Sequence, residues 1–179
     1  MVRRHAADGR QTRIIAAFDP GLSGAVAIAN PNAGRYEVRD LPTMGTGKQI
    51  VLNGAELAAH MRDSSVTNAV VEHVHAMPGQ GVSGMFRFGT AFGQILGVLQ
   101  ALEIPYELVQ PAKWKREMRL PGGKGKGETA LLRAIELMPS MAGELKRKKD
   151  HNRAEALLIA RWWVWTEYRD EALLLARSR

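Results

Sequence analysis

Short apolar runs separated by turn residues dominate the first forty residues and predict β-strands. Residues 14–18 form an apolar run that ends at Asp19, residues 25–29 form a second run, and residues 36–39 alternate between apolar and polar. Turns rich in glycine and asparagine separate the three segments, as in successive hairpins. We expect three consecutive antiparallel strands here.

Further along the chain, strand patterns alternate with helical ones. Residues 69–74 are a short apolar run of the kind found in a strand buried on both faces, and residues 106–109 predict a fifth strand. Apolar spacing of three and four predicts helices over residues 54–61, 83–102, 112–118, 128–137 and 154–168. The chain thus begins with three consecutive strands and continues with strands that alternate with helices. This order indicates the α/β class, with a mixed five-stranded sheet flanked by helices.

A chain of 179 residues is long enough for one domain with a continuous core. Neither an internal repeat nor a linker divides it. We therefore expect a basic, flexible arm over residues 1–13 and a single domain over residues 14–179.

The predicted helix over residues 83–102 carries three glycines on one stripe, at positions 89, 93 and 97. Glycine costs about 1 kcal/mol per position inside a helix, so a close approach to a neighbour is expected. That neighbour is either the sheet of the same chain or a second subunit.

Composition narrows the possible chemistry and location. The chain has no cysteine, so disulfides and thiolate zinc sites are excluded and any metal must use carboxylates or imidazoles. No apolar run reaches the roughly 18 residues needed to cross a bilayer, and the basic N-terminus is not followed by a secretory-type apolar core. We expect no membrane association and a cytoplasmic, nucleoid-associated location.

The net charge of +7 is concentrated in clusters. Such clusters fit a phosphate backbone, or else a solvated surface. Their members are Arg3, Arg4, Arg10 and Arg13, then Lys113, Lys115, Arg116, Arg119, Lys124 and Lys126, then Lys146 to Lys149.

Three acidic residues occur in apolar segments, where burial of a carboxylate costs free energy unless the carboxylate binds a partner. Asp19 ends a buried strand, Glu72 interrupts an apolar strand, and Glu155 lies in the opening turn of an apolar helix. Buried acids seldom lack a partner, and three converging carboxylates would repel one another unless a cation lay between them. Oxygen ligands favour Mg²⁺ or Mn²⁺.

Each acid also has a simpler interpretation. Asp19 before Pro-Gly suits a turn, and Glu72 could pair with a buried base. Glu155 could be an acid in the first turn of a helix, where the helix dipole stabilises it. Asp150 suits a helix N-cap. The order and context of all these residues together are more specific than any one of them.

At this point the sequence resembles the RuvC resolvases of the RNase H-like superfamily. Residues 14–21 followed by Ser23-Gly24-Ala25 resemble their first motif, a strand ending in Asp-Pro-Gly. Residues 70–74 resemble the second motif, a strand with one central glutamate, and residues 148–157 resemble the acidic last motif. The resemblance spans roughly residues 14 to 165.

The resemblance implies an RNase H-like fold, a homodimer, and cleavage of four-way (Holliday) or branched DNA junctions by paired nicks in DNA recombination and repair. It implies two Mg²⁺ or Mn²⁺ ions per active site, held by Asp19, Glu72 and Glu155. The helix over residues 83–102 is the candidate dimer contact. The compact length suits a bacteriophage member of the family.

The fourth ligand departs from the family pattern. Many relatives carry an Asp or His three residues before the last acid, where this chain has Asn152. His151 lies four residues before Glu155, on the same helical face, and Asp150 lies five before. One of these two is expected to replace the usual ligand, and Asp150 is slightly favoured by its Lys-Lys-Asp context.

Basic residues complete the expected site on the DNA side. Lys115 and Lys126 resemble family lysines that approach the phosphate backbone, and glycines beside Lys124 and Lys126 would allow close contact with DNA. His75 takes the approximate place where relatives touch the junction centre. The full set of expected DNA contacts is Lys113, Lys115, Arg116, Lys124, Lys126, His75, Lys148 and Lys149.

Two other functions remain open from the sequence. One is an RNase H-like nuclease for a different substrate shape, and the other is a non-catalytic, basic DNA-binding protein. An actin-like or sugar-kinase-like ATPase is excluded, because its second phosphate motif is missing and the chain is too short for two such domains.

Overall fold

The computed structural model describes residues 13–73, 81–120 and 126–177. Its strands are β1 (Ile15–Asp19), β2 (Ala25–Asn30), β3 (Arg35–Asp40), β4 (Thr43–Met44), β5 (Val51–Leu52), β6 (Asn68–Glu72) and β7 (Tyr106–Val109). Its α-helices are α1 (Gly54–Asp63), α2 (Val82–Ala101), α3 (Pro111–Glu117), α4 (Lys126–Leu137) and α5 (His151–Arg177). Short 3-10 turns connect several of them, including Pro139–Glu144 and Lys148–Asp150.

Five strands form one mixed sheet in the order β3-β2-β1-β6-β7. The first three strands pair antiparallel, as predicted, whereas β6 pairs parallel to β1 and β7 pairs parallel to β6. The register places Phe18 opposite Val71, so that β1 and β6 end side by side. This arrangement confirms the predicted α/β class and the mixed five-stranded sheet.

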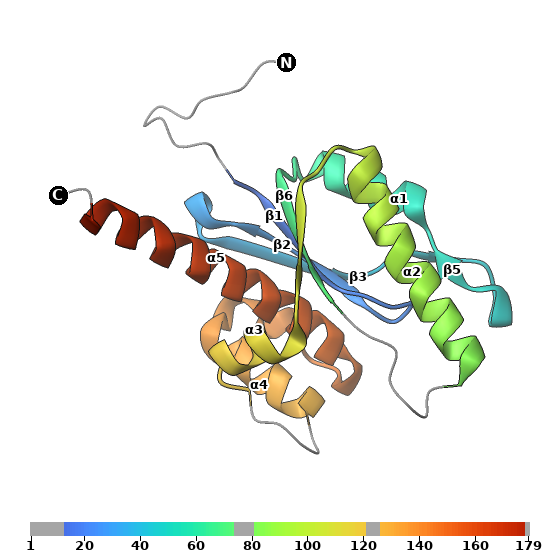
Figure 1. Ribbon diagram of the computed structural model, residues 1–179. Helices are drawn as coiled ribbons and strands as arrows, with labels where there is room; N and C mark the ends of the chain where they lie inside the picture. The colour runs from blue at the N-terminus through green and yellow to red at the C-terminus, as the bar shows by residue number, and fades with distance from the viewer. Residues whose placement is uncertain (1–12, 74–80, 121–125, 178–179) are drawn as a thin grey trace.

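Helices cover both faces of the sheet (Figure 1), with α3, α4 and α5 on one side and α1 and α2 on the other. Side chains of β1 alternate between the two layers because successive residues of a strand point to opposite faces. Ile15 and Ala17 join the core under α5, whereas Ala16 and Phe18 join the core under α1 and α2. The central strand is therefore buried on both faces, which explains its continuous apolar run.

Two differences from the expected elements concern small or terminal features. The last helix begins at His151 and extends to Arg177, whereas the sequence predicted residues 154–168. The two-residue strands β4 and β5 form a small separate sheet, which is too short to leave a recognisable alternation.

The three glycines of α2 do not contact the sheet. A Cβ built at Gly89, Gly93 or Gly97 meets no heavy atom within 4 Å among the described residues. Phe86, on the same stripe, is 76% exposed. The interpretation that the glycines pack tightly on the sheet is therefore wrong.

The turn between β1 and β2 is closed by a glycine that cannot be replaced without moving the backbone. A Cβ at Gly24 would lie 2.2 Å from the backbone oxygen of Asp19, and the Gly24 amide donates to the Gly21 carbonyl at 3.0 Å. Gly21 itself has a φ of 138°, a conformation that favours glycine. The Asp-Pro-Gly and Ser-Gly residues thus fix the backbone that carries the Asp19 side chain.

The predicted arm lies almost entirely outside the described residues. Its last residue, Arg13, donates to Glu167 of α5 at 2.6 Å. Within the described part of the chain, none of the helices has the length and apolar character that crossing a bilayer requires.

Candidate metal centre

Three acidic side chains from separate elements meet at one edge of the sheet. Asp19 ends β1, Glu72 ends the adjacent parallel strand β6, and Glu155 lies one turn into α5. Each offers a carboxylate oxygen, and these three atoms lie within 4.8 Å of one another. The convergence predicted for these residues is confirmed. It follows from the parallel pairing of β1 and β6, which brings two carboxyl ends together, and from the packing of α5 across them.

Two of the three carboxylates, those of Asp19 and Glu72, lie where a negative charge is unfavourable. Burial, with the charges of Glu155 and Glu72 beside it, raises the pKa of Asp19 well above its ordinary value. Burial also raises the pKa of Glu72, which is 5% exposed, and the charge of Glu155 adds to that effect. The fold thus concentrates negative charge at a place where water screens it poorly.

Among the described residues, the ammonium group of Lys115 contacts the cluster. Lys115 of α3 donates to Glu155 Oε2 at 2.8 Å, and its Nζ lies 3.8 Å from Glu72 Oε1. Burial alone would lower the pKa of Lys115, but the hydrogen bond and the charge of Glu155 raise it overall. Three ionised carboxylates and one ammonium leave a net charge of −2.

The donor set suits a hard divalent cation. All three ligand atoms are carboxylate oxygens, the donors that Mg²⁺ and Mn²⁺ prefer, and the local net charge matches one such ion. The raised pKa values of Asp19 and Glu72 also indicate a cation site, because a cation would stabilise the ionised forms that burial disfavours.

Trp114 is a member of this site that sequence analysis missed. Its indole Nε1–H donates to Glu72 Oε1 at 2.9 Å, and the side chain is fully buried. A tryptophan in a short helix next to a lysine carries no signal for such a contact. Only the packing of α3 against the end of β6 reveals it.

Asp150 is buried and hydrogen-bonded to Arg147. One carboxylate oxygen accepts from Arg147 Nε and Nη2 at 2.8 and 2.6 Å, and the other accepts from the Arg147 amide at 2.7 Å. Burial by itself would raise the pKa of Asp150, but these hydrogen bonds lower it overall. Among the described residues, the Asp, Glu and His side chains grouped within ligand distance are Asp19, Glu72 and Glu155, and neither Asp150 nor His151 is one of them.

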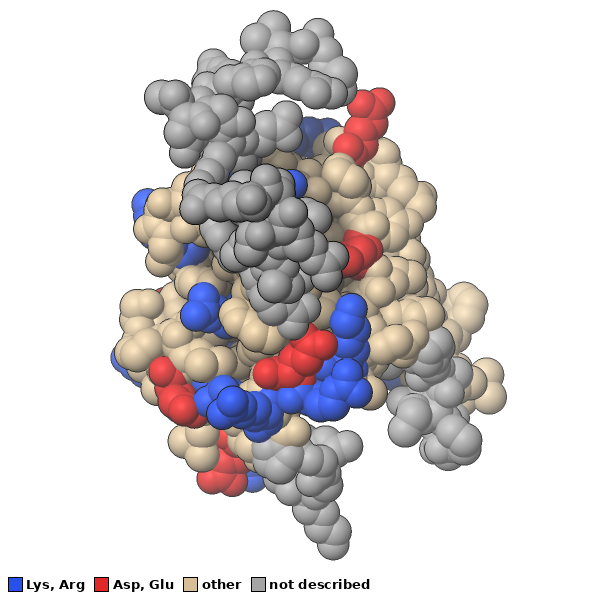
Figure 2. All heavy atoms as spheres, turned by 60° about the vertical axis from the view of Figure 1, so that its left-hand side comes forward, with Lys and Arg blue, Asp and Glu red and all other residues tan. Residues whose placement is uncertain are grey.

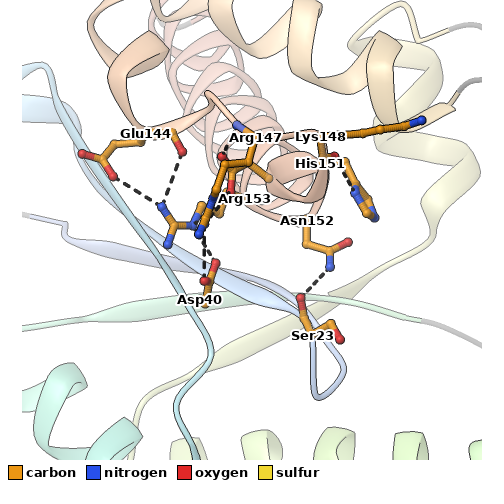
Figure 3. Close-up of polar contacts among 9 residues, drawn as sticks. Ser23, Asp40, Glu144, Arg147, Lys148, His151, Asn152 and Arg153 are labelled. Carbon is orange, nitrogen blue, oxygen red and sulfur yellow. Dashed lines mark hydrogen bonds and ion pairs between the residues drawn. The ribbon is translucent and has the colours of Figure 1, made fainter.

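A network of ion pairs ties the beginning of α5 to the end of β3 (Figure 3). Arg153 donates to Asp40 at 2.6 Å and lies 3.4 Å from the Glu144 carboxylate, and Arg147 lies 3.7 Å from Asp40. The hydrogen bond from Arg153 lowers the pKa of Asp40. These contacts fix the first turns of the helix that carries Glu155.

Asn152 and His151 lie in the same first turn. Asn152 Nδ2 donates to the backbone carbonyl of Ser23, which links α5 to the turn that follows Asp19 (Figure 3). The residue at the family's usual ligand position thus holds two parts of the site together. His151 Nδ1 lies 3.3 Å from the Lys148 carbonyl oxygen, and a Cβ built at Gly127 would lie 3.2 Å from His151 Cγ.

The expected DNA-binding residues fall into three groups. Lys113, Arg116, Lys148 and Lys149 are exposed, and the Lys113 ammonium lies 5.2 Å from the centre of the Trp162 ring. Lys115 lies in the acidic cluster. His75, Lys124 and the side chain of Lys126 lie outside the described residues. Figure 2 shows Lys and Arg side chains gathered in a band on one face, with acidic side chains beside them.

Asp19→Asn should raise the melting temperature of the metal-free protein by about 2 °C or more, since about 1 kcal/mol of relieved repulsion corresponds to 2–4 °C at this chain length. An acid whose pKa is raised by folding contributes stability below its unfolded pKa and loses it as the pH rises through the folded pKa. The gain should therefore be larger at pH 8 than at pH 5, as measured by thermal unfolding in EDTA. If Asp19→Asn melted at pH 8 at the same temperature as the wild type or below it, the inferred repulsion among the three carboxylates would be contradicted.

Comparisons with known proteins agree with this geometry. The chain is 30% identical over 164 residues to the chloroplastic Holliday junction resolvase MOC1 of Chlamydomonas reinhardtii. That alignment covers 89% of this chain, but the chain spans only 18% of the length of that relative. No protein-family model matches the sequence.

Solved structures of low sequence identity share the architecture. T. thermophilus RuvC in complex with a Holliday junction substrate matches with a TM-score of 0.55 at 16% identity, over 87% of this chain and 96% of that one. The yeast mitochondrial Holliday junction resolvase Ydc2 matches with a TM-score of 0.55 at 14% identity, over 86% of this chain and 78% of that one. With its 3-2-1-6-7 strand order and the acids at the ends of β1 and β6, the chain has the RNase H-like fold of the RuvC-like Holliday junction resolvases.

Proposed function

We propose that this protein is a metal-dependent endonuclease that resolves four-way DNA junctions by paired nicks. The observation that carries the proposal is the convergence of Asp19, Glu72 and Glu155 within 4.8 Å at one sheet edge of a RuvC-like fold. The similarity to MOC1 over most of this chain supports the same substrate class.

The residues of the cluster would hold the cations. Their net charge balances one divalent ion, and we propose two Mg²⁺ or Mn²⁺ ions per site because the resemblance to the RuvC resolvases implies two. Bound divalent ions supply Lewis acidity, which makes water a nucleophile and stabilises the leaving oxygen of a phosphodiester. Asp19, Glu72 and Glu155 would hold the ions from three separate elements. The sheet and α5 fix the relative positions of these three acids.

Basic residues around the cluster would bind the substrate backbone. Lys115 lies at the cluster, and α3 also carries the exposed Lys113 and Arg116. Lys148 and Lys149 are exposed directly before α5. Phosphate contacts of this kind fix the position and orientation of DNA without reading its sequence. We include His75, Lys124 and Lys126 in this DNA-binding set on the strength of the sequence resemblance.

Asp19→Asn should reduce cleavage of a synthetic four-way junction by at least about a hundredfold, because it removes a carboxylate charge from the metal cluster. Asp63→Asn is the matched control, since the same exchange at an exposed position of α1 leaves the cluster intact. Cleavage of junction, flap and linear duplex is measured side by side with Mg²⁺ and with Mn²⁺.

The other candidate functions give different results in this assay. Equal cleavage of flap or linear duplex would indicate an RNase H-like nuclease of different substrate shape. Junction binding without cleavage in either metal would indicate a non-catalytic, basic DNA-binding protein and would refute the proposed activity.

We propose His151 as the fourth ligand in preference to Asp150. His151 lies one helical turn before Glu155, on the same face of α5. A cation at Asp150 would compete with the three hydrogen bonds that its carboxylate accepts from Arg147. Asp150 therefore has a simpler role, which is to hold the chain at the start of α5.

His151→Ala should weaken Mn²⁺ binding about tenfold in calorimetry, as expected for loss of one ligand among several. Asp150→Asn should leave Mn²⁺ affinity within about twofold and lower the melting temperature, because it weakens the buried contacts with Arg147. The reverse pattern of affinities would assign the fourth position to Asp150.

We also propose a homodimer that forms through the outer face of α2. Gly89, Gly93 and Gly97 lie on this face with open space in front of them, and Phe86 continues the stripe into solvent. Glycines on an exposed helix face destabilise the isolated chain, but they allow a partner helix to approach closely. Paired nicking of a symmetric junction requires two active sites, which a dimer supplies.

Gly93→Arg should convert the dimer to a monomer in sedimentation equilibrium while the fold persists, because the position is open and arginine is the better helix former. Leu132→Arg, at a position of α4 that is 65% exposed, is the control and should remain dimeric. A monomeric wild type, or a dimeric Gly93→Arg protein, would refute this contact.

A further inference from the structure

We propose that Trp114 is a positioning residue that fixes the carboxylate of Glu72 for cation binding. This inference rests on the proposed metal-dependent function and names a residue outside the acidic cluster on which that function relies. Trp114 is uncharged, and it contributes one hydrogen bond to the Glu72 carboxylate from within the core.

Among the described residues, Trp114 and Lys115 contact the Glu72 carboxylate. It is 5% exposed, Trp114 Nε1 donates to its Oε1 at 2.9 Å, and Lys115 Nζ lies 3.8 Å from the same oxygen. The Trp114 contact is the shorter of the two and has hydrogen-bond geometry. Loss of the indole donor would leave the buried Glu72 carboxylate without this partner. The carboxylate could then rotate more freely about its Cγ–Cδ bond.

An indole is suited to this task because it can only donate. It has no acceptor atom and cannot ionise at physiological pH, so it does not compete with Glu72 for a cation. A carboxylate has two oxygens with several acceptor positions, so a bond to Oε1 orients the group and leaves capacity for a ligand bond. Partners of this kind, behind the ligands, typically change metal affinity by about 10- to 100-fold when removed.

The Trp114 ring is itself held in place. It is fully buried in the core shared by α3, α4 and α5, and the Lys115 ammonium lies 4.9 Å from the ring centre. Lys115, the next residue, donates to Glu155. Two successive residues of α3 thus contact two glutamates that come from β6 and α5, and α3 sets their relative position.

The chain offers a matched control in the same core. Trp162 is 2% exposed, and its Nε1–H donates to Glu117 Oε2 at 2.8 Å. Glu117 lies at the end of α3 and is not among the three acids that meet within ligand distance. Trp162→Phe therefore removes the same type of donor from a glutamate, at similar burial, without touching Glu72.

The test compares Mg²⁺ binding by calorimetry in the wild type, Trp114→Phe and Trp162→Phe, with the melting temperature of each metal-free protein as a measure of folding. Trp114→Phe should bind Mg²⁺ at least about tenfold more weakly. Trp162→Phe should bind as the wild type does, although both variants lose packing and stability. Equal affinity in Trp114→Phe and the wild type, or an equal loss in both variants, would overturn the role of Trp114 alone.

A second measurement does not depend on the folding of Trp114→Phe. Benzothienylalanine at position 114 keeps the bicyclic shape but replaces the N–H by sulfur, and it should show the same loss of Mg²⁺ affinity. In the wild type, the indole N–H resonance of Trp114, identified by its absence from that variant, should move on Mg²⁺ addition, whereas that of Trp162 should not. A stationary Trp114 resonance at saturating Mg²⁺ would overturn the proposal. A wild type that binds no Mg²⁺ would overturn the metal centre itself and this role with it.

Discussion

Crowding of like charge at the edge of the sheet is the constraint on which the site depends. Asp19, Glu72 and Glu155 are brought within 4.8 Å where burial raises the pKa of the first two. Such an arrangement is unfavourable for an isolated chain and persists because the surrounding structure enforces it. The parallel pairing of β1 with β6 and the packing of α5 supply that enforcement.

The polar contacts around the cluster oppose this repulsion in two ways. Lys115 reduces the charge directly, at 2.8 Å from Glu155. Asn152 and Arg153 act on the backbone instead, since they tie the first turn of α5 to Ser23 and to Asp40. Rigid support of this kind holds ligands in a geometry that they would not adopt alone.

The sheet and the three acids could be predicted from the sequence because burial of apolar strands leaves a clear pattern of residue types. An apolar run ending in Asp-Pro-Gly fixes a buried strand and the acid after it, and the single charge at Glu72 is conspicuous within an apolar strand. The role of Asp150 was not predictable in this way. Its side chain is bound by Arg147, and the choice between capping and ligation is made by packing that spacing does not encode. Trp114 was missed for the same reason.

The distribution of the three acids along the chain has a consequence for how the protein is made. Asp19 is synthesised early, and its strand pairs with β2 at once but must await β6 for its parallel partner. Glu155 follows more than eighty residues after Glu72. Contacts of such sequence separation form late in folding because long loops must close first. The cluster of three acids is therefore assembled only after α5, which carries Glu155, has docked on the sheet.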